Sequence, residues 1–243
     1  MHIVVQKFGG TSVANTEKLF KVCKHIKREK EKGNAVVVVV SAQGDTTDDL
    51  IQQEREITDN PSKREHDMLI SVGEQITIAK LAMCLQTIGY SAISYLGWQI
   101  PIVTDSNFTD ANIIKVYNKK IIQSLKQESI VIVAGFQGID KNHNITTLGR
   151  GGSDTTAIAL AASLKADKCE IFTDVDGVYS TDPNKDKNAK KYDKITYDKM
   201  LEMANNGAQV LHNKCVQMAQ KNNVKIVVKS TFQEDSVGTI VEA

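Results

Sequence analysis

The chain lacks most of the features that mark secreted, membrane-bound or nucleic-acid-binding proteins. Its four cysteines are far apart, with no CxxC pair and no histidine at zinc-finger spacing, so we expect neither disulfides nor a metal site. The formal net charge is only +1, which argues against nucleic acid as a partner. No run approaches the roughly 20 apolar residues of a membrane span, and the N-terminus lacks a secretory signal. We therefore expect a cytoplasmic protein without membrane contact.

Linker segments are lacking as well. The chain has 3 prolines, and no Ser/Gly-rich or strongly charged run divides its 243 residues. That length suffices to bury the core of one large α/β domain. We expect one folding unit with two lobes around a cleft.

What is present is an alternation of apolar strands and amphipathic helices, which predicts a sheet sandwiched between helices. The run 35–40 is β-branched at nearly every position, as suits a strand buried on both faces of a parallel sheet. The predicted strands are 2–8, 35–40, 90–96, 130–134, 168–173, 224–228 and 239–241, with a hairpin over 137–147. The predicted helices are 18–32, 64–87, 113–126, one after the glycines near 150, and two within 197–221.

Three glycine-bearing turns follow predicted strands: FGGTS at 8–12, SAQGDT at 41–46 and GRGGSD at 149–154. Free N–H groups at such turns favour a phosphate, and glycine lets it approach closely. In a doubly wound sheet the three turns would converge at the carboxyl edge of the strands. Neither a GxxxxGK[ST] P-loop nor a GxGxxG fingerprint is present, so any nucleotide must be bound by another design.

Four charged residues, three of them in or beside these turns, each allow two interpretations. Lys7 at a strand end either meets an anion or extends into water. Asp154 either acts in a site or caps a helix. Arg150 either grips a carboxylate or is a solvated loop residue. Glu74, inside an apolar stretch, needs either a substrate ammonium or an internal Lys or Arg. The DVDG at 174–177 lacks the other ligands of a calcium loop and predicts a tight turn.

Together, five segments resemble the aspartokinase pattern of the amino acid kinase family. They are KFGGTSV at 7–13, SAQGDTTDDL at 41–50, SVGE at 71–74, TTLGRGGSDTTA at 146–157 and TDVDGVYSTDP at 173–183. The resemblance runs from residue 3 to about 241. It implies a three-layer α/β/α sandwich with a mainly parallel sheet, formed by one domain over 1–243. Within it, an amino-acid-binding lobe would span about 1–140 and a nucleotide-binding lobe about 141–243.

The resemblance also implies phosphorylation of the β-carboxylate of L-aspartate by ATP, with Mg²⁺ held mainly by the nucleotide, in a homodimeric enzyme. Lys7 would neutralise the phosphoryl group in flight, and Asp154 would orient Lys7. The implied amino-acid pocket comprises Ser41, Thr47, Glu74, Arg150, Gly151, Gly152 and Ser153. The implied nucleotide site comprises Lys7, Gly9, Gly10, Ser12, Thr173, Asp174, Tyr179, Asp182, Asn184 and Gln209.

Two positions depart from the family pattern, which usually has Arg at 184 and Lys at 209 where this chain has Asn184 and Gln209. Both missing cations would face the nucleotide phosphates, and Lys185 or Lys214 could replace them. We also expect no ACT regulatory domain, because the sequence stops at GTIVEA. Two alternatives stay open: a kinase of another amino acid carboxylate, and a catalytically weakened kinase-like module that binds ligand for a partner.

Overall fold

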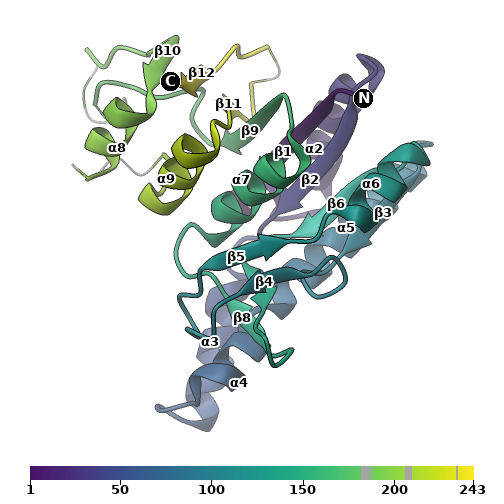
Figure 1. The fold of residues 1–243 in the computed structure, drawn as a ribbon, viewed down its shortest axis with the longest axis vertical. Helices are drawn as coiled ribbons and strands as arrows, with labels where there is room; N and C mark the ends of the chain where they lie inside the picture. Colours follow the sequence, from purple (N-terminus) through teal and green to yellow (C-terminus); the bar gives the residue numbers. More distant parts are fainter. Residues whose placement is uncertain (182–185, 187, 206–209, 234) are drawn as a thin grey trace.

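The structure is a computed structural model that describes residues 1–181, 186, 188–205, 210–233 and 235–243. Its centre is an eight-stranded sheet in the order β10-β12-β11-β9-β1-β2-β6-β3 (Figure 1). All neighbours in this sheet pair in parallel except β11 and β12. The strands are β1 (Ile3–Phe8), β2 (Ala35–Val40), β3 (Ala92–Tyr95), β6 (Ile130–Ala134), β9 (Lys168–Thr173), β10 (Lys194–Thr196), β11 (Ile226–Ser230) and β12 (Thr239–Glu242).

Strand β2 shows why the sheet is central. All six of its residues are buried, and it pairs in parallel with β1 on one side and β6 on the other. Val37 lies between Val5 and Val131 in this register. A β-branched run without polar alternation fits a strand covered on both faces.

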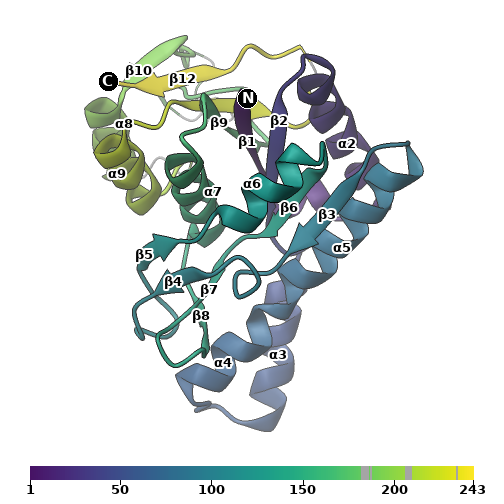
Figure 2. The same cartoon turned by 45° about the vertical axis from the view of Figure 1, so that its right-hand side comes forward.

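Helices cover both faces of the sheet (Figure 2). On one face, α2 (Thr16–Glu31) and α5 (Val72–Thr87) pack with Val36 and Val38 into one apolar cluster. On the other face, Val37, Val39 and Val133 form a second cluster with four helices: α6 (Lys119–Lys126), α7 (Gly152–Leu164), α8 (Tyr197–Asn205) and α9 (Asn213–Asn222). The expected three-layer α/β/α sandwich with a mainly parallel sheet is confirmed.

A smaller four-stranded sheet, in the order β5-β4-β7-β8, lies below the main sheet in Figure 1. It comprises β4 (Ile102–Thr104), β5 (Ile113–Val116), β7 (Gln137–Ile139) and β8 (Ile145–Thr147). The expected hairpin at 137–147 is the antiparallel pair β7–β8. Helices α3 (Thr46–Ile57) and α4 (Lys63–Ile70) form the lower end of the molecule, and the short α1 (Gly10–Val13) follows β1.

One predicted element was wrong in part, and others were missed. The helix expected over 113–126 begins only at Lys119, because residues Ile113–Val116 form β5 and pair antiparallel with β4. The residues of β5 are mostly β-branched, and cross-strand pairing decided their conformation. Helix α3 and the short strands β4 and β10 were not predicted.

The segment Lys63–Thr87, which contains α4 and α5, is the one run in the described chain that is long and apolar enough to be compared with a membrane span. Of its most apolar 18-residue window, 56% is buried inside the fold. The apolar residues of α5 pack on the sheet through Ile78, Leu81 and Leu85. This is the burial expected of a core helix.

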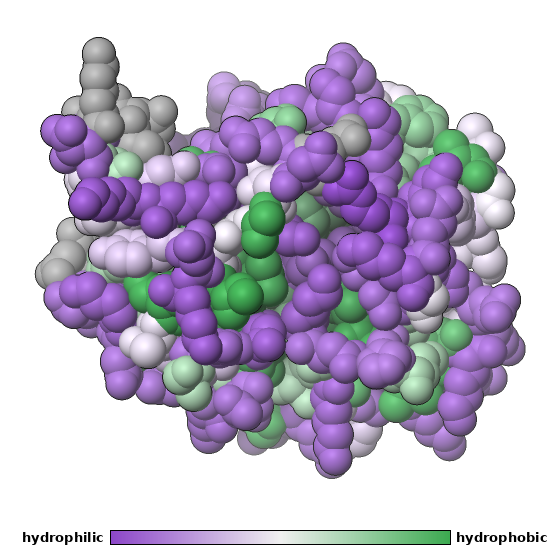
Figure 3. All heavy atoms as spheres, turned by 90° about the horizontal axis from the view of Figure 1, so that it is seen from above, coloured by the Kyte–Doolittle hydropathy of each residue, from purple (hydrophilic) through white to green (hydrophobic). Residues whose placement is uncertain are grey.

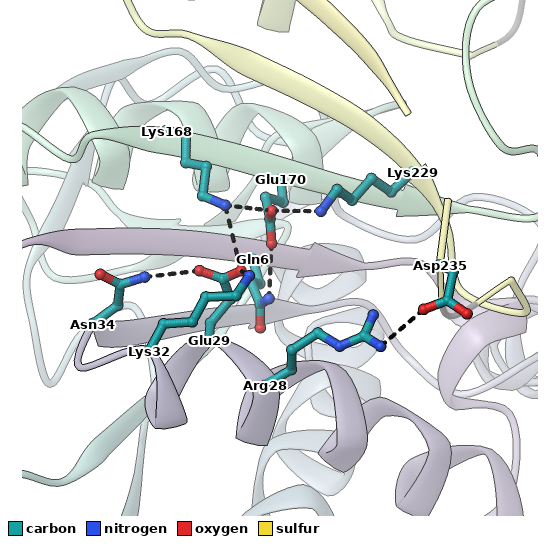
Figure 4. Close-up of polar contacts among 9 residues, drawn as sticks. All are labelled: Gln6, Arg28, Glu29, Lys32, Asn34, Lys168, Glu170, Lys229 and Asp235. Atoms are coloured by element: carbon teal, nitrogen blue, oxygen red, sulfur yellow. Dashed lines mark hydrogen bonds and ion pairs between the residues drawn. The ribbon is translucent and has the colours of Figure 1, made fainter. Parts of the chain in front are cut away.

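A buried polar network ties α2 to the sheet (Figure 4). The Glu170 carboxylate on β9 accepts from Lys168 at 2.7 Å, Lys229 at 2.9 Å and the Gln6 amide at 2.9 Å. Lys168 also lies 3.4 Å from Glu29 on α2. Burial alone would raise the pKa of Glu170, but the two lysines outweigh it and hold that pKa below its ordinary value. The face seen from above in Figure 3 is mostly hydrophilic.

Candidate active site

A cavity of about 630 Å³ opens at the carboxyl ends of β1, β2 and β6, where ligands bind in open α/β sheets. Helices α3 and α4 and the turn before α7 complete its wall. Its lining comprises Lys7, Gly9, Gly10, Ser41, Ala42, Gly44, Thr47, Asp48, Ile51, His66, Ile70, Glu74, Thr109, Phe136, Thr147, Gly149, Arg150, Gly151, Gly152, Ser153 and Asp154.

All three glycine turns contribute to this lining, as their position after the strands predicts. The first two touch each other: the Gly44 N–H donates to the Gly10 carbonyl at 3.1 Å. A Cβ on Gly10 would lie 2.8 Å from the Ala42 carbonyl oxygen, so this approach requires glycine. At the third turn, Gly151 has φ +72°, and a Cβ there would also meet the His212 side chain at 2.5 Å. Gly10, Gly44 and Gly151 all line the cavity, so this close packing forms part of its wall.

Lys7 and Asp154 form an ion pair within the cavity wall. The Lys7 Nζ lies 2.7 Å from the Asp154 Oδ1, and both side chains are mostly buried. Lys7 is near the end of β1 and Asp154 is in the first turn of α7, whose N-cap is Gly151. Asp154 is therefore not the N-cap, and Lys7 does not extend into water. The ion pair holds the Lys7 ammonium beside the first glycine turn, where a Cβ on Gly9 would lie 3.4 Å from Nζ.

Glu74 on α5 is a buried carboxylate without a cationic partner among the residues that the structure describes. Its Oε1 accepts from the Ala42 N–H at 3.0 Å, and its Oε2 has no hydrogen-bond partner among the described residues. Burial raises the pKa of Glu74 to about 7, against the smaller opposite effect of the Ala42 N–H. No lysine or arginine in the described part of the chain pairs with it, so the internal-cation interpretation is not supported. The free oxygen borders the cavity and suits an incoming ammonium.

The other residues expected in the amino-acid pocket also line the cavity. Ser41 follows β2, and Thr47 is in the first turn of α3. Arg150 is an exposed residue of the turn before α7. Arg150 and Glu74 offer opposite charges to one cavity, which is what a zwitterion requires.

Several residues expected at the nucleotide do not line the cavity. Ser12 is buried and its hydroxyl bonds to that of Thr231 at 2.6 Å. The Thr173 hydroxyl donates to the Val175 carbonyl and accepts from the Val175 N–H. Because Phe172 pairs with Phe8 in the adjacent strand, Thr173 at the end of β9 and Asp174 directly after it lie beside the first glycine turn.

Tyr179 lies later in the loop after β9, and its hydroxyl donates to Asp176 at 2.5 Å. This bond raises the pKa of the Tyr179 phenol. Asp182, Asn184 and Gln209, together with Lys185, lie outside the described residues. Lys214, the other possible replacement cation, forms an ion pair with Asp110.

Sequence reasoning missed several residues of the site, among them Asp67. Its fully buried carboxylate accepts from the Thr147 N–H at 2.9 Å and hydroxyl at 2.7 Å, and from the Thr109 N–H at 2.9 Å. Thr109 and Thr147 line the cavity, so Asp67 connects α4 to two parts of its wall. No local signal in the sequence indicates this role, because the partners of Asp67 are 42 and 80 residues away along the chain.

Replacing Asp67 by Ala is therefore expected to lower the free energy of unfolding by about 3 kcal/mol, because the buried N–H and hydroxyl of Thr147 and the part-buried N–H of Thr109 lose a charged acceptor. Urea unfolding measures the change. Asp59→Ala, which removes an exposed carboxylate from the loop before α4, is the control and is expected to stay within about 0.5 kcal/mol of the parent. An equal, small effect of both substitutions would contradict the assignment.

Comparison with known proteins identifies the class to which this fold and cavity belong. A model of the amino acid kinase family matches residues 2–230, and the chain belongs to that family. The chain is 52% identical over 242 residues to an aspartokinase of Bacillus sp. (strain MGA3) and to aspartokinase 2 of Bacillus subtilis (strain 168), covering 100% of this chain and 59% of each relative. The resemblance to aspartokinases is thus confirmed, and the chain spans about three fifths of these relatives.

Solved structures of aspartate kinases share the fold of this chain. An aspartate kinase from Synechocystis superposes with a TM-score of 0.87 at 46% identity, covering 99% of this chain and 40% of that one. E. coli aspartokinase III in complex with aspartate and ADP superposes with a TM-score of 0.88 at 27% identity, covering 99% of this chain and 64% of that one.

Proposed function

We propose that this chain is the catalytic part of an aspartate kinase, which transfers the γ-phosphoryl group of MgATP to the β-carboxylate of L-aspartate. The observation that carries the proposal is the unpaired, buried oxygen of Glu74 in a cavity that also holds Arg150 and the Lys7–Asp154 pair. This set of charges suits an amino acid zwitterion beside a phosphate. The similarity to aspartokinases along the whole chain supports the same substrate.

In the proposed reaction, Glu74 receives the α-ammonium and Arg150 the α-carboxylate, with Ser41 and Thr47 completing the pocket. One oxygen of the β-carboxylate attacks the γ-phosphorus, and the bond from that phosphorus to the ADP oxygen breaks. The products are an acyl phosphate and ADP, without a covalent enzyme intermediate. Lys7 offsets charge on the migrating phosphoryl group, and the glycine turns donate N–H groups to its oxygens.

Nucleotide would occupy the edge beside the first glycine turn, near the end of β9, with its magnesium coordinated mainly by the phosphates. Thr173 and Asp174 would border it there. In proteins of this kind, catalysis comes from positioning and charge compensation.

The direct test is turnover with L-aspartate and MgATP. We expect coupled ADP release together with an acyl phosphate that hydroxylamine traps. A panel of other amino acids separates this activity from that of a kinase with a longer acceptor. ATP binding without turnover on any of them would instead favour a binding module.

The ionisation of Glu74 leads to a pH prediction. Since its pKa is raised to about 7, the free protein carries a protonated Glu74 below that pH, and a protonated carboxyl attracts an ammonium only weakly. We expect kcat/KM for aspartate to fall about ten-fold per pH unit below pH 7 and to level off above it. A steady-state profile at saturating MgATP measures this. A flat profile between pH 5.5 and 8 would remove Glu74 from the proposed role.

A further inference from the structure

Helix α3 forms part of the cavity wall but is weakly anchored. It contributes Thr47, Asp48 and Ile51 to the lining, yet of its twelve residues only Glu54 is buried. Its last residue, Ile57, is 85% exposed. Burial of apolar surface therefore does little to hold this helix, and helices with few buried apolar contacts open at low free energy.

Polar contacts fix the N-terminal end of α3. The Thr46 hydroxyl donates to the Gln43 carbonyl at 2.6 Å, and the Gln43 amide donates to the Val13 carbonyl at 2.6 Å. These bonds join the start of the helix to the second glycine turn and to α1. They do not reach its second half.

The second half is held by His66 of α4. The His66 Nδ1 lies 3.0 and 2.8 Å from the two carboxylate oxygens of Glu54, and both side chains are mostly buried. A carboxylate only accepts, so Nδ1 carries the proton that it donates. Among the described residues, no other side-chain hydrogen bond or ion pair joins the second half of α3 to another element. His66 itself lines the cavity.

We propose that the His66–Glu54 pair is a positioning device that fixes the second half of α3 against α4 and, together with the contacts at the N-terminal end, holds the α3 wall with Thr47 and Ile51 at the amino-acid end of the cavity. The identity of the amino acid rests on the proposed function, whereas the pair and the weak anchoring of α3 do not. Glu54 is seven residues from Thr47, about two turns along one rigid helix. A mostly buried pair holds its geometry better than an exposed one, which solvent and salt weaken.

Loss of the pair would leave α3 displaced in a larger fraction of molecules. The apparent affinity for aspartate falls in proportion to the fraction of molecules in which α3 is in place. Saturating aspartate returns the displaced molecules to the arrangement seen in the structure. The KM for aspartate should therefore rise while kcat changes little. The KM for ATP should stay unchanged, because the bonds that join the start of α3 to the glycine turns do not involve the His66–Glu54 pair.

The decisive measurement is amide hydrogen exchange of residues 46–57 in the complete chain, followed by mass spectrometry. Glu54→Ala and His66→Ala are each expected to raise exchange in this segment about ten-fold, and the KM for aspartate by a similar factor, with kcat within about two-fold of the parent. His66→Gln, which keeps an N–H donor, should give a smaller effect. Glu56→Ala removes an exposed carboxylate from the same helix and should match the parent.

The double variant Glu54→Ala/His66→Ala should resemble either single variant, because both remove the same interaction. Unchanged exchange of 46–57 in both single variants would overturn the proposal. Faster exchange spread equally over β1 and β2 would also overturn it, since the pair would then support the fold as a whole. If the parent forms no acyl phosphate from aspartate, only the proposed function fails, because the exchange comparison requires no turnover.

Discussion

Replacing Lys7 by Ala is expected to lower kcat about a thousand-fold, equivalent to about 4 kcal/mol of lost transition-state stabilisation. The ammonium lies in the cavity wall, held 2.7 Å from Asp154, in surroundings that exclude most water. A charge fixed in advance in such a place stabilises a migrating phosphoryl group more than a mobile one in solvent. Single-turnover kinetics with saturating MgATP and aspartate measure the loss.

The substitution also leaves the Asp154 carboxylate without its cation, so a lower melting temperature is expected beside the lost turnover. Lys7→Ala/Asp154→Asn separates the two effects. The double variant should recover stability but not activity. Lys21→Ala, which breaks an exposed ion pair with Glu17 on α2, is the control and should behave like the parent. Near-normal turnover in the Lys7→Ala protein would refute the proposed chemistry.

Replacing Glu74 by Gln is expected to change stability and binding in opposite directions. The raised pKa, about 7 against an ordinary 4.5, means that the native state keeps a proton that the unfolded state has lost. Stability contributed by this group therefore falls as pH rises from 4.5 to 7 and stays low above 7. A glutamine at this position does not ionise, so its contribution to stability does not change with pH. At pH 8 the variant should therefore be more stable than the parent by on the order of 3 kcal/mol.

The same variant should lose about 100-fold in kcat/KM for aspartate, because an amide oxygen attracts the α-ammonium less than a carboxylate does. Urea unfolding at pH 5 and pH 8, together with steady-state kinetics at pH 8, tests both halves. A variant that is less stable than the parent at pH 8 would show that Glu74 has a cationic partner in the free protein.

Glu170→Gln provides a matched comparison. Both carboxylates are almost fully buried, but Glu170 is paired with Lys168 and Lys229 and its pKa is lowered. Its native-state pKa lies below the unfolded value, so its contribution to stability is present above pH 4.5 and is lost as pH falls through the native pKa. The substitution should therefore destabilise the protein at pH 8. Opposite signs for the same change at Glu170 and Glu74 would distinguish a structural carboxylate from a binding one.

Much of the fold could be predicted from the sequence, because most of its signals are local. The uninterrupted β-branched run at Ala35–Val40 defines a central strand, and the glycines after β1 and before α7 mark two turns of the cavity. The carboxyl edge of a parallel sheet then brings these turns together. Lys7, Glu74 and Arg150 could be chosen as candidate site residues from the sequence. A charge in an apolar strand or helix needs a partner of opposite charge, and an arginine between glycines can grip a carboxylate.

What could not be predicted depends on contacts between distant parts of the chain. Residues Ile113–Val116 carry an apolar spacing that continues into α6, and only pairing with β4 makes them a strand. The role of Asp67 depends on Thr147, 80 residues away. Helix α3 could not be predicted from an apolar stripe, because Glu54 is its only buried residue. His66 was missed for the same reason, since its partner lies on that helix.

Because α3 buries only one of its residues, it bears on how the preference for the phosphoryl acceptor would change among relatives of this chain. The central sheet and the charged groups at its edge depend on a tightly interlocked core, in which few exchanges are neutral. A wall segment that buries one side chain is free of that constraint. Under the proposed function, substitutions at its lining positions would alter the preference for the amino acid with little effect on the stability of the central sheet.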